Sequence, residues 1–536
     1  MKRFFAILIS LVIAFSALPV CLATAETVTP VIVVSGKGSY PLTVKETGEQ
    51  AYGPSGDKIA NLVIKNIPAL TSFLVTKNWQ KLADEVAGDV YNDIFEIMSC
   101  DEEGNSKHQL ATKTFAKSVD NYPEDWAFEG RIADEEAVVS AMVDTVGANN
   151  TYFFNYDWRL DPMDHADDLN SFVENVKKEK KCSKVILIPC SMGGVITNSY
   201  LSEYGSDSCE KIIYAMTAFQ GMDMVGELFC KNIDIDTDML TEYLFSFQRD
   251  KTDMQIVVAL LKALTEVFPE ISGSLDSLME ESLFELNDRI YNEVIRDSLA
   301  SCPGFWSFVP EEYYAKAKAA MFGGKINKVF EEKIDAYHYG VQVKSKEIMD
   351  KAIAGGTAII LLSSYGYMGA PCADSAYTQG DCLIEAHREA GGAVTARWGE
   401  TLGDKNYTAK GTVCSIKEHN HVSTDCIIDA STGMYPEYTW YLKYNKHVGL
   451  DYNTDCTAFL SYLVRTKGQP NVHSNPEFPQ FMEFNNITGK LSSLTGSELN
   501  ISFLDKETTF ITRLIIILES LYWNVINYFE SVGKNR

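Results

Sequence analysis

The sequence of 536 residues is poor in positive charge and lacks several recognition motifs. It holds 47 Lys and Arg against 73 Asp and Glu, a formal net charge of −26, and so acidic a surface repels phosphate backbones. We therefore expect no nucleic acid among its partners. No two cysteines are spaced as C-x-x-C, which argues against a zinc ribbon and a thioredoxin-like site. No internal repeat is visible, which argues against a solenoid.

Long apolar runs are also scarce beyond the N-terminus. The C-terminal segment 508–529 is rich in Ile, Leu and aromatic residues, but its longest unbroken apolar run is Leu514–Leu518. A membrane-spanning helix needs about 20 such residues. Polar residues recur in this segment at helical spacing and form one stripe, which predicts an amphipathic helix. That helix either packs on the protein or makes peripheral contact with a membrane surface.

The N-terminus has the pattern of a signal peptide. Two cations at positions 2 and 3 precede the apolar run Phe4–Leu18, and Ala23-Thr-Ala25 is a small-x-small cleavage site. We expect removal of residues 1–25 and a secreted protein. Export permits disulfides, and 11 cysteines remain once Cys21 is removed with the signal.

Short apolar runs alternate with long helical stretches along the rest of the chain. The runs show no polar alternation, which is typical of strands covered on both faces of a parallel sheet. Strands and helices that alternate in this way indicate the α/β class, with a mostly parallel sheet and helices on both faces. Six runs are expected as strands: residues 28–34, 151–155, 184–188, 211–216, 356–362 and 439–443.

A long segment with helical periodicity separates the fourth and fifth expected strands. An insertion of this length in a sheet protein predicts a helical cap, which we expect to act as a lid. The expected organisation is a signal peptide at 1–25, a first core part at 26–221, the cap or lid at 222–355, a second core part at 356–470 and a tail with the amphipathic helix at 471–536.

One segment has the pattern of a nucleophile elbow, a sharp turn between a strand and a helix. An apolar strand ending at Pro189 leads to Ser191, then to Gly193 and Gly194, and then to a helical stretch. Such a turn projects the serine hydroxyl above the sheet edge. It also places the N–H of Met192 at a helix N-terminus, where it can stabilise an oxyanion. Pro189 departs from the G-x-S-x-G pattern, but a strand tolerates proline at its end.

The segments Tyr156-Asp-Trp-Arg-Leu-Asp161 and Pro189-Cys-Ser-Met-Gly-Gly194, with a helix between them, resemble the lecithin:cholesterol acyltransferase family of α/β-hydrolases. In that family a Tyr-Asp-Trp-Arg segment precedes an A-H-S-M-G-G elbow. The resemblance covers about residues 28–220 and, more weakly, about 300–465. It implies an α/β-hydrolase fold, a Ser–Asp–His triad and action on acyl esters, usually of lipids.

A serine nucleophile needs a base, and in the α/β-hydrolase order the histidine comes last. His447 follows the last expected strand and a short loop, so we expect it to be the base. His473 is a lesser candidate, since it lies among Asn, Ser and Pro in an expected surface loop. His419 and His421 form an H-x-H pair, but no third ligand with a recognisable zinc spacing accompanies them. We expect a polar loop there and no metal site.

Three carboxylates compete for the acid, which must orient His447 and stabilise its imidazolium form. Asp381 follows the strand region 359–367, in a block that resembles the family's G-D-G-T-V. Asp425 stands in a similar block nearer to His447, and Asp429 ends that block. We expect Asp381 to be the acid, with Asp425 and Asp429 as open alternatives.

The second oxyanion donor is expected in the turn Ser35–Gly38 after the first strand, from the backbone N–H of Lys37 or Gly38. This turn is not a phosphate loop, because no Gly-Lys-Ser/Thr opens a helix there. Cys372 and Cys382 bracket the expected acid, which predicts a disulfide around it. We expect Cys190, inside the elbow, to remain a thiol.

These features predict a secreted serine hydrolase, either a lipase or phospholipase or an O-acyltransferase, whose substrate is a lipid or another apolar ester. The triad needs no organic cofactor and no metal. Two alternatives remain: a secreted binding protein that keeps the fold without the chemistry, and a peptidase or amidase on the same triad. The sequence does not indicate the oligomeric state.

Overall fold

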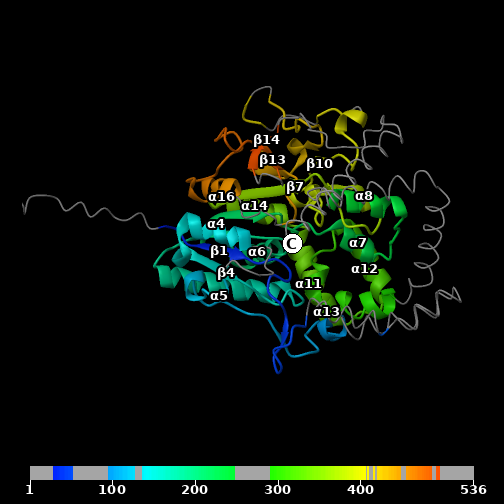
Figure 1. Cartoon of the computed structure of the whole chain (residues 1–536). Helices are drawn as coiled ribbons and strands as arrows, with labels where there is room; N and C mark the ends of the chain where they lie inside the picture. The colour runs from blue at the N-terminus through cyan, green and yellow to red at the C-terminus, as the bar shows by residue number, and fades with distance from the viewer. Residues whose placement is uncertain are drawn as a thin grey trace, which may run out of the picture.

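An eight-stranded sheet lies at the centre of the computed structural model (Figure 1). The strand order is β14-β13-β12-β7-β6-β5-β1-β4, and all neighbours are parallel except β13 and β14. The strands are β1 (Val31–Val34), β4 (Thr151–Phe154), β5 (Val185–Pro189), β6 (Cys209–Ala215), β7 (Ala358–Tyr365), β12 (Thr439–Lys443), β13 (Phe481–Asn485) and β14 (Lys490–Ser493).

The structure describes residues 28–51, 65, 95–126, 136–247, 290–405, 407–409, 414–416, 419–447, 454–485 and 490–494. The signal peptide expected at 1–25 and the amphipathic C-terminal helix lie outside these residues. Among the helices that are described, none is long and apolar enough to cross a membrane.

The central strands are buried on both faces, as their unbroken apolar runs predict. Every residue of β1, β5 and β7 is buried. Side chains alternate between the two faces of a strand, so Ile32 and Val34 enter one hydrophobic core while Val31 and Val33 enter another. Two layers of apolar side chains therefore stabilise the sheet from opposite sides.

Helices cover both faces of the sheet (Figure 1). On one face α4 (Glu136–Val146) and α16 (Thr454–Arg465) pack against the core that contains Val31 and Val33. On the other face lie α5 (Pro162–Lys180), α6 (Gly193–Tyr204) and α14 (Ser345–Ala354). Parallel strands need such crossover helices, because the chain must return to the same end of the sheet between strands.

The described part of the expected cap is helical. Its last helix, α14, lies in the layer on the sheet, where it serves as the crossover from β6 to β7. The expected cap region 248–289 lies outside the described residues, and its action as a lid stays a prediction. The other α-helices in the described part of the segment are α7 (Asp223–Phe229), α8 (Thr237–Phe247), α11 (Pro303–Trp306), α12 (Glu311–Phe322) and α13 (Lys328–Tyr337).

Between β7 and β12 the chain forms short ribbons that hold the acid candidates. The ribbon of β8 (Tyr367–Met368) and β9 (Gln379–Gly380) ends directly before Asp381. The short helix α15 (Ala386–Glu389) follows and packs on β7. A second ribbon joins β10 (Val394–Thr395) to β11 (Ile428–Asp429), and near the N-terminus β2 (Thr43–Val44) pairs with β3 (Leu110–Ala111).

All six strands expected from the sequence are present, and the α/β class with a mostly parallel sheet is confirmed. The edge strands β13 and β14 were not expected. Buried and partly exposed residues alternate along β13, and most of β14 is exposed, so neither forms a continuous apolar run.

Candidate active site

Ser191 stands in the turn between β5 and α6, where the elbow pattern places it. Its φ of +51° lies in the left-handed region, which residues other than glycine rarely adopt. Two neighbouring strands fix this turn. The N–H of Cys190 donates to the Val34 carbonyl at 3.0 Å, and the N–H of Ser191 donates to the Ala215 carbonyl at 3.2 Å. The sheet thus maintains a strained backbone at the serine.

Close contacts explain the two glycines after Ser191. A Cβ at Gly193 would lie 2.3 Å from the Val34 carbonyl oxygen, and a Cβ at Gly194 would lie 2.5 Å from Cβ of Thr217. Real Cβ atoms do not approach backbone this closely, so α6 can begin beside the strands only without side chains at these positions. Pro189 is the last residue of β5, the position at which a strand tolerates it.

His447 lies in the loop after β12, and its ring joins the predicted nucleophile to the first of the predicted acids. Nε2 of His447 is 2.9 Å from Oγ of Ser191, and Nδ1 is 2.5 Å from Oδ2 of Asp381. The backbone N–H of His447 also donates to the Asp381 carbonyl at 2.8 Å. A carboxylate at Nδ1 keeps the ring proton there, so the lone pair of Nε2 faces the serine hydroxyl.

The Asp381 carboxylate is fully buried and well supplied with donors. Its Oδ1 accepts the N–H groups of Leu383 at 2.9 Å and Ile384 at 2.7 Å, and Oδ2 faces His447. Burial is the strongest influence and acts to raise the pKa of Asp381. The imidazole and the donated hydrogen bonds outweigh it and hold that pKa below its usual value. Asp381 therefore stays ionised beside the histidine.

A second buried carboxyl, Glu389 of α15, lies beside the same carboxylate. Ligand atoms of Asp381, Glu389 and His447 all lie within 4.8 Å of one another. Burial, followed by the negative charge of Asp381, raises the pKa of Glu389 well above its usual value, so this carboxyl is neutral. Its Oε2 accepts the N–H of Ser364 at 2.6 Å. The local sequence does not single out Glu389 as a site residue, because only the fold brings it close to Asp381.

Glu389→Gln is expected to make the protein progressively more stable than the wild type as pH rises. A carboxyl whose pKa is higher in the folded state stabilises the fold most at low pH, and this contribution is lost as pH rises through the folded-state pKa. The amide stays neutral. Thermal melts of both proteins from about pH 5 to pH 9 measure the difference. A difference that does not change with pH would contradict the neutral state of Glu389.

The two alternative acids have other partners. Oδ2 of Asp425 is 2.9 Å from Nζ of Lys443, and both side chains are buried. Oδ1 of Asp429 accepts the N–H of Ser431 at 3.0 Å, and its Oδ2 accepts the hydroxyl of Tyr407 at 2.7 Å. These contacts anchor the loops between β7 and β12, whereas Asp381 is the candidate that meets the imidazole.

The H-x-H pair, which has no third ligand at a recognisable zinc spacing in the sequence, has two further potential ligands beside it in the structure. The structure brings His419 and His421 together with Cys414 and His473, whose potential ligand atoms all lie within 4.8 Å of one another. His473 follows α16, on the other side of β12 along the chain, so sequence spacing could not reveal it. His473 does not take part in the triad contacts. Its Nε2 instead faces Sγ of Cys414 at 3.2 Å.

The predicted oxyanion donors occupy two adjacent turns. Met192 immediately precedes α6, so its N–H is among the terminal groups that have no acceptor within the helix. The turn Ser35–Gly38, with Lys37 and Gly38, follows β1, whose last residue lies beside Pro189 in the sheet register. Both turns therefore lie at the carboxyl edge of the sheet that carries Ser191.

The Tyr156–Arg159 segment supports the turn after β1. The Tyr156 hydroxyl donates to the Ser35 carbonyl at 2.9 Å, and Nζ of Lys37 lies 4.6 Å from the ring centroid of Trp158. The first contact fixes the start of the turn, and the second holds its lysine over an aromatic face. The resemblance identified these residues without giving them a role.

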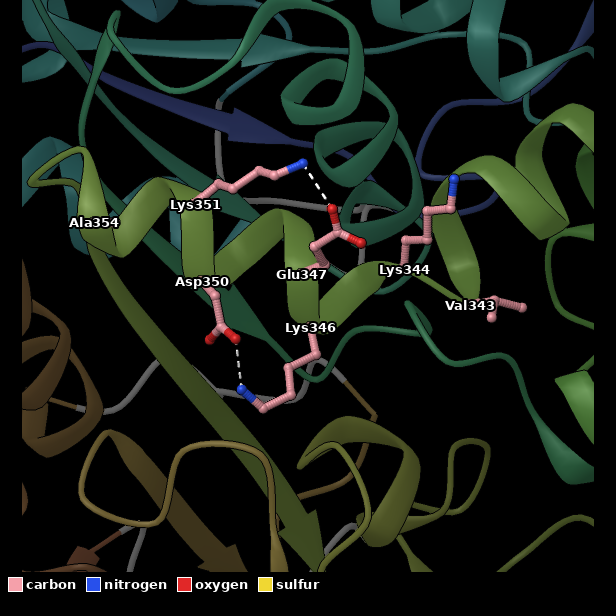
Figure 2. Close-up of a pocket in the computed structure, with 7 residues that line it drawn as sticks. All are labelled: Val343, Lys344, Lys346, Glu347, Asp350, Lys351 and Ala354. Carbon is pink, nitrogen blue, oxygen red and sulfur yellow. Dashed lines mark hydrogen bonds and ion pairs between the residues drawn. The ribbon is translucent and has the colours of Figure 1, made fainter.

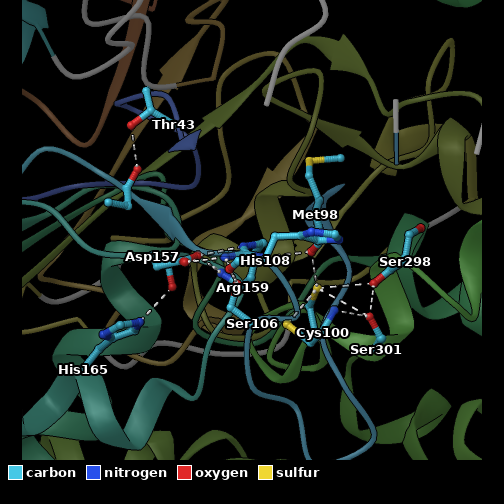
Figure 3. A network of polar contacts seen from close by, with 12 residues as sticks. Thr43, Met98, Cys100, Ser106, His108, Asp157, Arg159, His165, Ser298 and Ser301 are labelled. Carbon is cyan, nitrogen blue, oxygen red and sulfur yellow. Dashed lines mark hydrogen bonds and ion pairs between the residues drawn. The ribbon is translucent and has the colours of Figure 1, made fainter. Parts of the chain in front are cut away.

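Arg159 ties the same segment to the chain around residue 98 (Figure 3) and to α11. The guanidinium is fully buried and binds both oxygens of Asp157, at 3.0 and 2.7 Å. It also donates to the Met98 carbonyl at 3.0 Å, while the Arg159 carbonyl accepts the N–H of Gly304 at 2.9 Å. A planar guanidinium with several donors suits such a buried junction.

The expected disulfide around the acid is not present. Cys372 and Cys382 are both thiols, and they lie in different surroundings. The Cys372 carbonyl accepts the N–H of Asp234, whereas Cys382 packs with Tyr367 and Tyr444. Cys190 is a buried thiol, as expected. Elsewhere, Sγ of Cys100 and Sγ of Cys302 lie 3.7 Å apart.

A hollow at α14 with several charged residues in its lining lies apart from these groups (Figure 2). Its charged residues pair along the helix at i,i+4 spacing, Lys346 with Asp350 at 2.6 Å and Lys351 with Glu347 at 2.8 Å. Such pairs are usual on a solvated helix face. None of the residues that line the hollow belongs to the Ser191 site.

Comparisons with known proteins identify no family. No family model matches the chain, and no curated protein matches it. Ten chains of solved structures match it in shape. One comes from the crystal structure of the Tle4-Tli4 complex, with 11% identity and a TM-score of 0.24, covering 63% of this chain and 75% of that chain. A likeness at this level carries no argument about the fold or the activity.

Proposed function

We propose that this protein is a serine hydrolase with an α/β-hydrolase fold that acts on acyl esters. The observation that carries the proposal is the contact series from Ser191 Oγ through both ring nitrogens of His447 to Asp381, at 2.9 and 2.5 Å. A serine, an imidazole and a carboxylate in this order are the parts of a nucleophilic triad. The positive φ of Ser191 supports the proposal, since strain of this kind concentrates at functional sites.

The reaction would proceed through an acyl-enzyme. Oγ of Ser191 attacks the ester carbonyl carbon while Nε2 of His447 takes the hydroxyl proton. The bond to the alcohol then breaks, and His447 returns that proton to the leaving oxygen. Water or a second alcohol attacks the acyl-enzyme, giving its proton to His447, and Ser191 is released with its proton restored. Asp381 stabilises the imidazolium form in both halves.

Two backbone donors would stabilise the tetrahedral oxyanion. One is the N–H of Met192 at the start of α6, and the other belongs to Lys37 or Gly38 in the turn after β1. Donors fixed in place before the reaction need no reorganisation when charge develops, and each contributes about 3–4 kcal/mol in enzymes of known mechanism. The contacts of Tyr156 and Trp158 with this turn would preserve its shape.

An aromatic cluster beside the turn supports an apolar substrate. The rings of Phe305 and Phe308 are 5.5 Å apart, those of Phe229 and Phe305 are 5.9 Å apart, and Nζ of Lys37 is 5.5 Å from the Phe305 ring. The segment expected as a cap thus packs apolar side chains near the side chain of Lys37, which belongs to the turn expected to supply an oxyanion donor. With the resemblance to lecithin:cholesterol acyltransferases, this favours lipid esters, processed by hydrolysis or by O-acyl transfer.

A panel of p-nitrophenyl esters of increasing acyl length, micellar lipid esters and matched amides tests the proposal. We expect turnover of esters, faster with longer acyl chains, and little cleavage of amides. Adding a long-chain alcohol separates hydrolysis from acyl transfer by the products formed. An absence of turnover on every ester would contradict the proposal, as would faster cleavage of the amides.

A further inference from the structure

Four metal-ligating side chains converge outside the proposed active site. We call Cys414, His419, His421 and His473 the Cys-His cluster. Their potential ligand atoms, one sulfur and three ring nitrogens, lie within 4.8 Å of one another. The triad uses none of them, and the fold gathers them from both sides of β12 along the chain.

The spacing of the cluster fits a tetrahedral metal site. Sγ of Cys414 lies 3.4 Å from Nδ1 of His419 and 3.2 Å from Nε2 of His473. Zinc–sulfur bonds of about 2.3 Å and zinc–nitrogen bonds of about 2.0 Å place sulfur and nitrogen about 3.5 Å apart in a tetrahedron. The three histidine rings also lie close, with centroids 4.8 to 5.5 Å apart. Small shifts would therefore complete the coordination geometry.

His421 is already oriented as a ligand. Its Nδ1 faces Oε1 of Gln480 at 2.5 Å, and Nε2 of the same glutamine donates to the carbonyls of Pro436 and Thr439 at 2.6 and 3.1 Å. The glutamine oxygen can only accept, so the ring proton of His421 belongs on Nδ1 and the lone pair on the ring's Nε2. Nε2 of His421 is buried without a hydrogen-bond partner and belongs to the cluster. Outer hydrogen bonds of this kind are typical of metal-bound histidines.

The turn that carries Cys414 is also held in place. The N–H of Ile416 donates to Sγ of Cys414 at 3.3 Å. The next residue, Ser415, donates from its N–H and its hydroxyl to Oε1 of Glu437, at 2.8 and 2.6 Å. Glu437 thereby fixes the turn, and its Oε1 lies 3.9 Å from Nε2 of His473, beyond hydrogen-bonding distance.

We propose that the Cys-His cluster binds one Zn²⁺ in a closed structural site with one sulfur and three nitrogen ligands. Four protein ligands leave no open position for a substrate, which distinguishes such a site from a catalytic zinc centre. On binding, the Cys414 thiol loses its proton and the three imidazoles bind as neutral rings. The ion would join residues 414 and 419–421 to the segment after α16, across a part of the sheet that has no disulfide among the described residues.

The proposed zinc site and the triad lie at opposite ends of β12. Gln480 bonds to Thr439, the first residue of that strand, whereas His447 follows its last residue, Lys443. Four residue steps of about 3.3 Å place roughly 13 Å of strand between them. The zinc proposal therefore stands independently of the proposed hydrolase activity, and zinc is expected to stabilise the fold on which His447 is placed.

Metal analysis of the full chain, produced without a histidine tag, tests the proposal. We expect one zinc per chain, removal by a strong chelator with a lower thermal midpoint, and recovery of both on adding Zn²⁺. Co²⁺ added to the metal-free protein should give visible bands of a tetrahedral ion and a near-ultraviolet band from thiolate to metal. No stoichiometric zinc, or octahedral Co²⁺ without a thiolate band, would overturn the proposal.

Cys414→Ser is expected to weaken zinc binding by about 100-fold or more and to abolish the thiolate band. Cys426→Ser is the matched control, because Cys426 is an exposed thiol twelve residues away that is not part of the cluster. His473→Gln provides a second variant should the serine variant not fold, and it should weaken zinc binding while keeping the cysteine. Wild-type zinc affinity in both ligand variants would overturn the assignment.

Discussion

Ser191→Ala is expected to lower kcat for ester hydrolysis by about 10⁶-fold while leaving the thermal midpoint nearly unchanged. The substitution removes the hydroxyl that lies 2.9 Å from Nε2 of His447. Alanine keeps the Cβ, so the backbone strain at φ +51° is the same in both proteins. Single-turnover and steady-state rates on a p-nitrophenyl ester, with thermal melts of the same samples, measure both effects.

Ser199→Ala is the matched control for this substitution. Ser199 is also buried, but its hydroxyl donates to the Val195 carbonyl within α6 at 3.1 Å. Removing that hydroxyl breaks a hydrogen bond within α6 and removes no contact of Ser191, His447 or Asp381, so esterase activity should persist. Retained esterase activity in Ser191→Ala would refute Ser191 as the nucleophile, and equal loss in both variants would indicate a structural cause.

Asp381→Asn is expected to lower kcat by about 10⁴-fold with little effect on KM. Oδ1 of Asp381 accepts two backbone N–H groups, from Leu383 and Ile384, so an asparagine would keep its oxygen there and turn its NH₂ toward His447. Nδ1 would then have to accept, and the ring proton would move to Nε2. An Nε2 that carries a proton cannot take the one on Ser191, so attack on the ester fails.

Asp425→Asn is the informative comparison for the acid. Asp425 pairs with the buried ammonium of Lys443 at 2.9 Å, and loss of its charge leaves that ammonium uncompensated. We expect a loss of about 3–5 kcal/mol in stability with kcat largely retained in the folded fraction. If Asp425→Asn instead abolished activity without lowering stability while Asp381→Asn remained active, the acid would be misassigned.

The central strands could be predicted because a strand that is buried on both faces appears in the sequence as an unbroken apolar run. A strand such as Val185–Pro189 must be apolar at every position, so composition alone reveals it. The edge strand Phe481–Asn485 includes polar residues and partly exposed positions, so it forms no continuous apolar run that would reveal it.

The proposed nucleophile and base could be singled out from local sequence and chain order, whereas the sequence left three candidates for the acid. Asp381 and Asp425 each precede a cysteine at positive φ and accept the N–H two residues on, at 2.9 and 3.3 Å. The same local sequence thus forms the same local turn twice. Only tertiary packing places one turn beside His447 and the other beside Lys443, and this information is absent from any short segment.

The Cys-His cluster was missed for a related reason. His419 and His421 lie two residues apart in the sequence. Of the other two potential ligands, Cys414 comes five residues before His419, and His473 comes after both β12 and α16. No fixed spacing joins such ligands, because the sheet rather than the local chain sets their distance. Glu389 was missed as well, since a neutral buried glutamate has the same sequence signature as an exposed one.

Covalent labelling of the native full chain with a fluorophosphonate probe, followed by mass-spectrometric location of the adduct, tests the central claim most directly. The probe reacts with a serine only where a base activates the hydroxyl and donors stabilise the oxyanion. The proposed triad predicts stoichiometric modification of Ser191, abolished by unfolding and strongly slowed in His447→Ala. An unlabelled native protein, or an adduct on another serine with Ser191 unmodified, would contradict it.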